Sequence, residues 1–359
     1  MPKAIRWFFK FISIIIALGL GVTAIILGAA VYLNSPPPHP AVLTDRPELS
    51  PAIMRIEDNV LYMEIRSGES AQSVGRRLHN AGIIRHRYFW NLLFRLDGEF
   101  IKTGTYRIEL PASQTRIRSI LVSGEQLLVR VTIPEGVTLR RAARILEDAG
   151  ICGFDDFLAA ASSREILDAF NIPGASMEGY LFPDTYLFPL GFPATMVVTA
   201  MANNFFNRLA EIEPEALSLS PAELNERVIL ASIVEREHRI PEEAAIMAGV
   251  FTNRLRIGMA LQSCATIEYI ITEILGQPHP TRIFYRDLEI RNPFNTYMFP
   301  GLPPGPISGP GETALRAAFN PARTDYLYFR LVDPSTGRHH FSRTLEEHIR
   351  AGALFVGRR

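Results

Sequence analysis

The sequence predicts a mixed α+β protein with an N-terminal transmembrane helix, a small α+β module and a larger, mainly helical α+β domain. Three observations predict this arrangement. A segment of 23 residues without a charge follows a basic N-terminus, a strand–turn–helix pattern occurs twice with an offset of 68 residues, and helix start signals dominate the second half of the chain. The length of 359 residues agrees with two or three domains of about 150 residues each.

The N-terminal segment has the length and charge pattern of a membrane anchor. Residues 11–33 contain no charged side chain, and as a helix they would extend about 34 Å, enough to cross a hydrocarbon core of roughly 30 Å. A cleaved signal peptide normally has a shorter apolar region of about 7–15 residues, so a retained anchor is favoured. Lys3, Arg6 and Lys10 precede the segment, and no lysine or arginine lies in 34–40. The positive-inside rule therefore predicts a single-pass protein of the inner (cytoplasmic) membrane, with its N-terminus in the cytoplasm and the rest of the chain periplasmic or extracytoplasmic.

The composition excludes several classes of protein. Lys+Arg and Asp+Glu both number 37, so the chain lacks the basic excess of a general nucleic-acid-binding protein. The cysteines, Cys152 and Cys264, are too few for a disulfide scaffold, and the sequence leaves open whether they pair. A GxGxxA match at 19–24 lies in the predicted membrane segment, which lacks the strand that a dinucleotide site requires. We therefore expect no cofactor, no metal and no nucleic-acid partner.

A small module follows the anchor. The internal repeat aligns residues 65–83 with 133–151, and each copy combines a strand, a glycine turn, an amphipathic helix and a glycine stop. The segments 104–110 and 127–133 also have strand character. We expect the first copy to belong to a module of residues 58–131, and the second to begin the next domain. The pattern leaves two roles open for the module, binding of an extended ligand or a spacer above the membrane.

Helices dominate the second half of the chain. The segment Ser220–Glu223 is a capping box with proline at the first helical position, which predicts a helix that runs to about His238. Pro241 opens another helix, which Gly258 closes. Within residues 325–342, two short apolar runs flank an Asp-Pro-Ser-Thr-Gly turn, which predicts a β-hairpin.

One carboxylate is distinguished by its position in the first of these helices. At about 100° per residue, Glu235 continues an apolar stripe of the helix, where a carboxylate is either buried or exposed in a cleft. Its neighbours Ala231 and Ser232 are small, which would leave room for a ligand. Glu237 lies on another face, and periodicity alone does not exclude it. The alternative is that Glu235 is structural and pairs with an arginine such as Arg254.

Two segments are richer in aromatic residues than an ordinary surface loop. They are residues 177–188 and residues 292–297, and a glycine- and proline-rich loop at 301–311 follows the second. Flat apolar rings beside amides and carboxylates bind sugars, because a pyranose has an apolar face and a rim of hydroxyls. The alternative is packing in the core, which is the more frequent role of such rings.

Taken together, these motifs resemble those of the MltG-type, YceG-like endolytic murein transglycosylases. The resemblance rests on five segments in the same order, at 178–186, 230–237, 250–262, 295–297 and 301–307. The anchor and a LysM-like module before the catalytic region also match, so the resemblance covers nearly the whole chain. It implies five parts in this order: a cytoplasmic tail (1–10), a transmembrane anchor (11–33), a proline-rich linker (34–57), the LysM-like module (58–131) and the transglycosylase catalytic domain (132–359).

The resemblance also implies an activity. The family cleaves peptidoglycan glycan strands internally, between N-acetylmuramic acid and N-acetylglucosamine, and leaves 1,6-anhydro-N-acetylmuramic acid ends. Its catalytic glutamate lies in the Ala-Ser-Ile-Val-Glu segment, which implies Glu235 here. The implied partners are glycan strands, the membrane and peptidoglycan synthases, with termination of nascent strands as the role. The implied substrate-binding residues are Glu178, Tyr180, Gln262, Thr266, Asn295, Thr296 and Tyr297.

This chemistry needs only one carboxylic acid. A lytic transglycosylase, which is a carbon–oxygen lyase, uses the sugar's own C6 hydroxyl as nucleophile, so one glutamate can protonate the leaving oxygen and then remove the C6 proton. One position departs from the family: Cys264 stands where the family usually has aspartate, and no role of that aspartate is carried over. Two alternatives stay open, a hydrolytic muramidase with Glu178 or Asp184 as second carboxylate, and a non-catalytic wall-binding scaffold of the division or elongation machinery.

Overall fold

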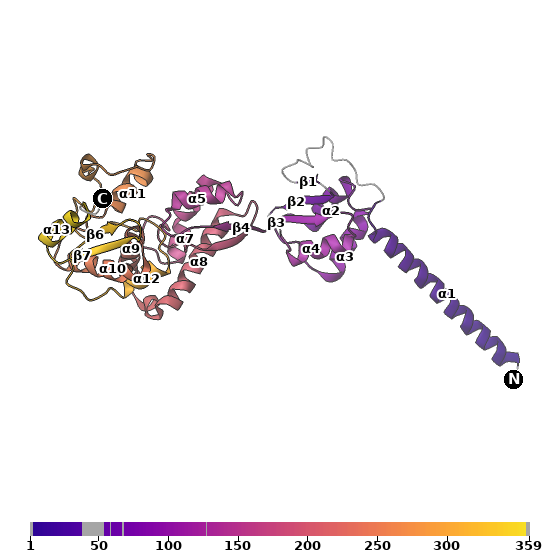
Figure 1. Cartoon of the computed structure of the whole chain (residues 1–359). Helices are drawn as coiled ribbons and strands as arrows, with labels where there is room; N and C mark the ends of the chain where they lie inside the picture. Colours follow the sequence, from indigo (N-terminus) through magenta and orange to yellow (C-terminus); the bar gives the residue numbers. More distant parts are fainter. Residues whose placement is uncertain (1–2, 38–53, 58, 67, 127, 357–359) are drawn as a thin grey trace. The chain divides into compact units, whose positions relative to one another are not determined.

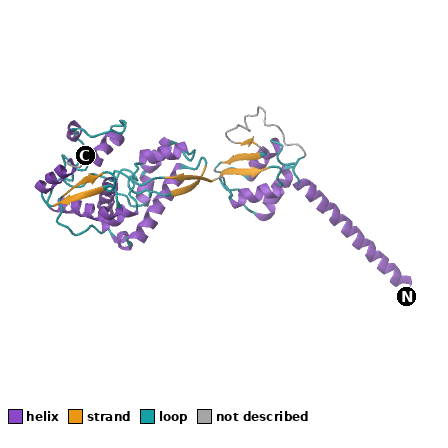
Figure 2. Cartoon of the chain, in the orientation of Figure 1, coloured by secondary structure: helices purple, strands orange, loops and turns teal. Residues whose placement is uncertain are grey.

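The computed structural model describes residues 3–37, 54–57, 59–66, 68–126 and 128–356. Most of the predicted proline-rich linker lies outside these residues. Helices and sheets both occur along the chain (Figures 1 and 2), which confirms the mixed α+β class. The chain divides into two compact units, residues 1–128 with 189–191, and residues 129–188 with 192–359.

The N-terminal segment is one long helix, α1 (Lys3–Asn34) (Figure 1). Within it, Ile14–Asn34 is long and apolar enough to cross a membrane, and no other helix in the described part of the chain meets that criterion. Its large apolar side chains, such as Leu20 and Ile25, are exposed. The structure thus confirms a single apolar N-terminal helix at the position that the sequence predicts.

The rest of the first unit is a small α+β module. Its three strands form an antiparallel sheet in the order β1-β2-β3. Strand β2 alternates between buried and half-buried side chains, and Leu61, Met63 and Ile65 point into a core that also contains Trp90. The elements are β1 (Met54–Glu57), β2 (Val60–Ile65), α2 (Ala71–Asn80), α3 (Arg87–Asp97), β3 (Gly104–Glu109) and α4 (Gln114–Ser123).

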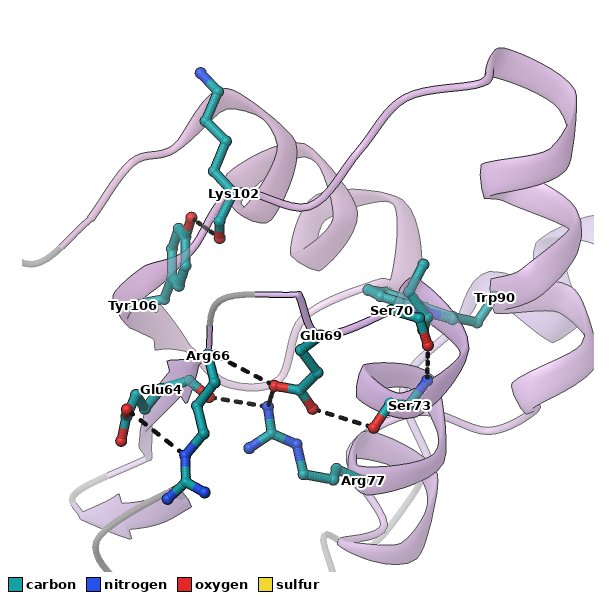
Figure 3. A network of polar contacts seen from close by, with 10 residues as sticks. Glu64, Arg66, Glu69, Ser70, Ser73, Arg77, Trp90, Lys102 and Tyr106 are labelled. Carbon is teal, nitrogen blue, oxygen red and sulfur yellow. Dashed lines mark hydrogen bonds and ion pairs between the residues drawn. The ribbon is translucent and has the colours of Figure 1, made fainter.

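A buried ion pair fixes the turn between β2 and α2 (Figure 3). Arg77 on α2 donates to the Glu69 carboxylate at 2.9 Å and to the backbone carbonyl of Glu64 at 2.9 Å. Both side chains of the pair are largely buried, at 11% and 14% exposure. The second Glu69 oxygen accepts from the Ser73 hydroxyl, and the Ser70 side chain caps α2 by accepting from the backbone N–H of Ser73. Both Glu69 oxygens find partners within this turn, whereas the Nε atom of Arg77 is buried without one; we interpret the pair as structural.

The internal repeat is visible in the backbone of both units. In each copy a strand leads through a glycine with positive φ, Gly68 (φ 78°) or Gly136 (φ 74°), to an amphipathic helix. The helices are capped alike, because the side chains of Ser70 and Thr138 each accept from the backbone N–H three residues on. The predicted repeat is therefore confirmed, and its helix caps share the offset of 68 residues.

The second unit is mainly helical, with two small sheets. Strands β4 and β5 pair with each other, and β6 and β7 form an antiparallel hairpin, as predicted. The strands are β4 (Leu128–Thr132), β5 (Thr185–Pro189), β6 (Tyr328–Asp333) and β7 (Arg338–Ser342). The α-helices are α5 (Leu139–Asp148), α6 (Phe154–Ala161), α7 (Arg164–Ala169), α8 (Ala194–Ile212), α9 (Pro221–Glu237), α10 (Pro241–Arg256), α11 (Cys264–Tyr269), α12 (Glu312–Phe319) and α13 (Leu345–Val356). Short 3₁₀ or π turns are η2 (Pro214–Ser218), η3 (Ile270–Ile274) and η4 (Tyr285–Glu289).

Helix α9 runs through the centre of this unit. It begins with the predicted capping box, in which the Ser220 hydroxyl and the Glu223 carboxylate each accept from the other's backbone N–H. Every residue from Val228 to Val234 is buried, so this stretch is covered around its whole circumference. The predicted single apolar stripe is therefore wrong for this part of the helix, because α9 is a core helix rather than a surface one.

The space beside Ala231 and Ser232 is filled by the protein itself. The glycine- and proline-rich loop packs onto α9 there, with the backbone N–H of Ile307 donating to the Ser232 hydroxyl at 3.0 Å. The hydroxyl of Ser308 in turn donates to the Ser232 carbonyl at 3.1 Å. Ile307, Ser308 and Ser232 are fully buried. The expectation of room for a ligand at these small residues is therefore wrong, since they admit a loop instead.

Candidate active site

A cavity of about 520 Å³ opens where the C-terminal end of α9 meets the loop before α11 and the β6–β7 hairpin. All of its lining residues belong to the second unit. Residues from three of the sequence motifs line it, together with basic and aromatic side chains of the hairpin and α13. The motif residues that line it are Arg236, Glu237, Leu261, Gln262 and Tyr297, and Cys264, Ala265 and Glu268 of α11 lie beside them.

Glu237, the last residue of α9, presents its carboxyl group to this cavity. One of its oxygens accepts a hydrogen bond of 2.5 Å from the Ser263 hydroxyl. Burial raises the pKa of Glu237, and the neighbouring Glu268 carboxylate raises it further, whereas Ser263, His339 and the backbone at Ala265 lower it. The net direction is upward, so a neutral carboxylic acid is favoured nearer to neutral pH than for an exposed glutamate.

Arg254 on α10 stabilises the part of the cavity wall that surrounds Glu237. Its guanidinium donates to the carbonyl of Leu261 at 2.6 Å and to that of Leu327 at 2.6 Å, and it is buried. It thereby ties the loop before α11 to the start of β6. Arg254 also interacts electrostatically with Glu237, and no contact joins it to Glu235. The sequence-based pairing of Arg254 with Glu235 is therefore wrong.

Two of the predicted substrate-binding residues line the cavity. Gln262 is exposed there and adopts a left-handed backbone conformation with φ 51°, held by a hydrogen bond from its N–H to the Thr296 carbonyl at 3.0 Å. The Tyr297 hydroxyl lies 3.1 Å from the sulfur of Cys264. Burial raises the pKa of Tyr297, so its hydroxyl stays a hydrogen-bond donor. An amide and a phenol thus face the same space as the Glu237 acid.

Three other predicted residues lie behind the cavity wall and are buried. Asn295 donates from its side-chain amide to the carbonyls of Leu288 and Ile290 at 2.9 and 2.8 Å. The hydroxyls of Thr266 and Thr296 lie 2.9 Å apart, and the Thr296 hydroxyl accepts from the backbone of Ser263 at 3.1 Å. The polar groups of these side chains make hydrogen bonds inside the protein. These bonds stabilise the loops that carry Gln262, Ser263 and Tyr297.

The last two predicted residues lie elsewhere. Glu178 is buried and both of its oxygens accept from the backbone N–H of Leu139, at the first turn of α5. Burial raises its pKa to about 8. Tyr180 is 1% exposed, stacks among phenylalanines of α8 and donates to Asn225 at 2.9 Å. Neither side chain lines the cavity of Glu237, and both have the geometry of core residues.

Glu235, the sequence-predicted catalytic residue, lies beside the N-terminus of α12. Its carboxylate accepts from the backbone N–H of Gly311 at 3.0 Å, and it does not line the cavity that contains Glu237. Burial raises its pKa, the charge of Glu135 raises it further, and the Gly311 N–H lowers it. The two glutamates thus have different surroundings: Glu235 accepts from the loop that leads into α12, and Glu237 lines the cavity.

Sequence reasoning missed two further features of the site. Ser263 orients Glu237, and it lies directly after Gln262 in a motif that had been singled out, so its position was a usable signal. The basic residues of the hairpin and α13, Arg330, His339 and His348, reach the cavity from a segment about 100 residues further along; no local pattern reveals this. Among the described residues no group of three metal-ligating side chains is placed to hold a metal ion.

Comparison with known proteins agrees with this arrangement of motifs. The model of the YceG-like family matches residues 63–353, which is most of the chain. The chain belongs to the YceG-like family. It is 28% identical over 313 residues to the endolytic murein transglycosylase of Bacillus subtilis (strain 168), covering 82% of this chain and 84% of that protein.

Two further proteins are also similar to this chain over most of its length. The endolytic murein transglycosylase of Streptococcus pneumoniae serotype 2 (strain D39) is 27% identical over 327 residues, or 81% of this chain; the chain spans only 58% of that longer protein. A YceG-like protein from Listeria monocytogenes with a crystal structure is 29% identical, with a TM-score of 0.55 over 81% of this chain and 98% of the other. The residues matched by the family model, 63–353, include every residue that lines the cavity.

Proposed function

We propose that this protein is an endolytic murein transglycosylase that cleaves peptidoglycan glycan strands between N-acetylmuramic acid and N-acetylglucosamine. The observation that carries the proposal is a glutamic acid, Glu237, with a raised pKa in a cavity that also presents Gln262 and Tyr297. The names of the Bacillus and Streptococcus relatives support the substrate class. We further propose that the products carry 1,6-anhydro ends and that cleavage terminates the elongation of nascent strands.

Glu237 is the acid in this proposal. The Ser263 hydroxyl donates to one of its oxygens, which leaves the other to carry the proton toward the glycosidic oxygen. The leaving N-acetylglucosamine takes this proton as the C1–O bond breaks. The resulting carboxylate removes the proton of the muramic acid C6 hydroxyl, whose oxygen attacks C1 and closes the anhydro ring. Gln262 and Tyr297 would position the sugars.

A hydrolytic muramidase is the rival enzyme, because the cavity also contains Glu268. The two carboxylates first considered for that role, Glu178 and Asp184, do not line the cavity. Glu268 does, but it is held in an ion pair with Arg236 at 2.8 Å. The arginine competes with a water for the oxygens of this carboxylate, which favours the intramolecular reaction.

The size of the products tests the proposal against a non-catalytic scaffold. Purified glycan strands incubated with the protein should be cut internally, so the mean strand length should fall before single disaccharides accumulate. Strands whose length distribution is unchanged by the wild-type protein would support the wall-binding scaffold instead. Release of disaccharides alone from strand ends would contradict the endolytic part.

We propose that α1 anchors the protein in the inner membrane with its N-terminus in the cytoplasm and the rest of the chain in the periplasm. Charge asymmetry supports this orientation, because Lys3, Arg6 and Lys10 precede the apolar span. A periplasm-dependent reporter fused after Arg359 should be active, and a cytoplasm-dependent one should be inactive. The reverse pattern would contradict the orientation. Peptidoglycan synthases, which act at the same membrane face, are the proposed partners.

We propose that residues 58–131 form a LysM-like module that binds glycan strands. Three helices and an antiparallel sheet around one apolar core support it. Deleting the module from the full chain should weaken sedimentation with purified murein sacculi while bond cleavage on short soluble strands persists. Equal sedimentation of the deletion variant and the full chain would reduce the module to a spacer.

A further inference from the structure

The charges that line the cavity are unbalanced. Four arginines line it, against two carboxylates. Arg236 is neutralised by Glu268 at 2.8 Å, and the guanidinium of Arg254 is bound to backbone carbonyls. Among the described residues, Arg239 and Arg330 make no ion pair. The cavity therefore has a positively charged side that no protein carboxylate compensates.

Arg330 lies at the centre of this positive side. It is an exposed residue of β6, and its guanidinium makes only a long contact of 3.5 Å to the His348 carbonyl. The pKa of His348 is lowered by burial and then by the charges of Arg330, Arg254 and His340. The Nδ1 atom of His348 is buried without a hydrogen-bond partner. Arg330, Arg254 and His340 thus disfavour a further positive charge on His348, and a bound anion would lower this electrostatic cost.

Arg239 reaches the same cavity from the other side, two residues beyond Glu237. Its base is fixed by packing, because a Cβ atom added at Gly337 in the turn of the hairpin would lie 3.0 Å from the Cβ of Arg239. His339 also lines the cavity, but its Nδ1 atom already pairs with the Glu243 carboxylate at 2.8 Å. Arg239 and Arg330 are therefore the cations that are free to contact a ligand.

We propose that Arg239 and Arg330 form a subsite for a carboxylate of the peptide stem carried by the substrate's muramic acid, so that the enzyme prefers strands with charged stems. This inference rests on the proposed function. The sugars of the strand carry neutral hydroxyl and acetamido groups wherever a stem caps the lactyl carboxyl, and the free carboxylates belong to the stem. Guanidinium groups bind carboxylates through charge-assisted, often bidentate hydrogen bonds. Specificity for the stem would then add to recognition of the sugars.

Three substrates test the subsite with the full-length protein. They are glycan strands with peptide stems, the same strands after amidation of the stem carboxylates, and strands from which the stems have been removed. Arg239→Gln and Arg330→Gln should each raise KM about tenfold on the first substrate, as expected for loss of a hydrogen bond to a charged group. On amidated strands the wild type should show the same rise, and neither variant should add to it.

Arg164→Gln is the matched control, because Arg164 is an exposed arginine of α7 that pairs with Asp168 away from the cavity. It should leave KM unchanged on all three substrates. Equal KM values for wild type and variants on charged stems would overturn the subsite. An equally large effect of the variants on strands without stems would assign the site to the muramic acid's own lactyl carboxylate and overturn the stem assignment. A wild-type protein that cuts none of the substrates would contradict the proposed function itself.

Discussion

Replacing Glu237 with glutamine is expected to lower kcat on glycan strands by about 10²–10⁴-fold or more, the usual contribution of a general acid and base. Glutamine keeps the shape and can still accept from Ser263, but it has no transferable proton. The same group predicts the pH dependence. Burial and Glu268 raise the pKa of Glu237, so the protonated form needed first should persist toward neutral pH, and kcat/KM should fall as the pH rises through that raised pKa.

The matched control is Glu235→Gln in the same helix. Glu235 accepts from the backbone of Gly311 outside the cavity, so this variant should retain activity within about tenfold, a loss of positioning rather than of proton transfer. Both variants are compared at equal folded protein, checked by thermal melting. If Glu235→Gln is inactive and Glu237→Gln is active, then Glu235 is the catalytic residue, as the sequence motif implied.

Replacing Gly179 with alanine is expected to cause the largest loss of stability. Gly179 has φ 83°, and a Cβ atom there would lie 2.4 Å from the Cβ of Pro306 and 3.0 Å from a methyl group of Val228. Left-handed strain and overpacking together should lower the free energy of unfolding by about 3 kcal/mol, which corresponds to a fall in Tm of roughly 6–12 °C for a domain of this size. The clash is with a proline ring, which has little freedom to move.

Gly258→Ala separates the two causes. Gly258 has nearly the same backbone conformation, φ 68°, but no atom lies within 4 Å of an added Cβ. It should therefore lose only the strain contribution, about 1 kcal/mol. If the two variants melt at the same temperature, the contact between Gly179 and Pro306 does not fix the glycine- and proline-rich loop against α9.

Local structure could be predicted from the sequence because its signals are local. The capping box at Ser220, the stop at Gly258 and the two repeat copies depend on residues within a few positions of one another, and the structure has all of them. The apolar run of α1 needs only its own composition. These features fix the class of fold and the order of its elements.

The placement of the site residues could not be predicted in the same way. Which of Glu235 and Glu237 lines the cavity depends on how α10, α12 and the loop at Ile307 pack around α9. Glu178 binds the backbone of Leu139, 39 residues away, and a polar residue used in this way looks the same in sequence as one that binds a ligand. Long-range packing decides which motif residues face the cavity.

The mass of the new strand ends tests the central claim most directly. Glycan strands are digested with the wild-type protein in water enriched in ¹⁸O, and the muramic acid ends are analysed by mass spectrometry. Intramolecular attack by the C6 hydroxyl predicts 1,6-anhydro ends that lack the mass of one water and carry no ¹⁸O, and Glu237→Gln should yield almost none. Reducing ends that have gained a labelled water would show hydrolysis and contradict the transglycosylase assignment.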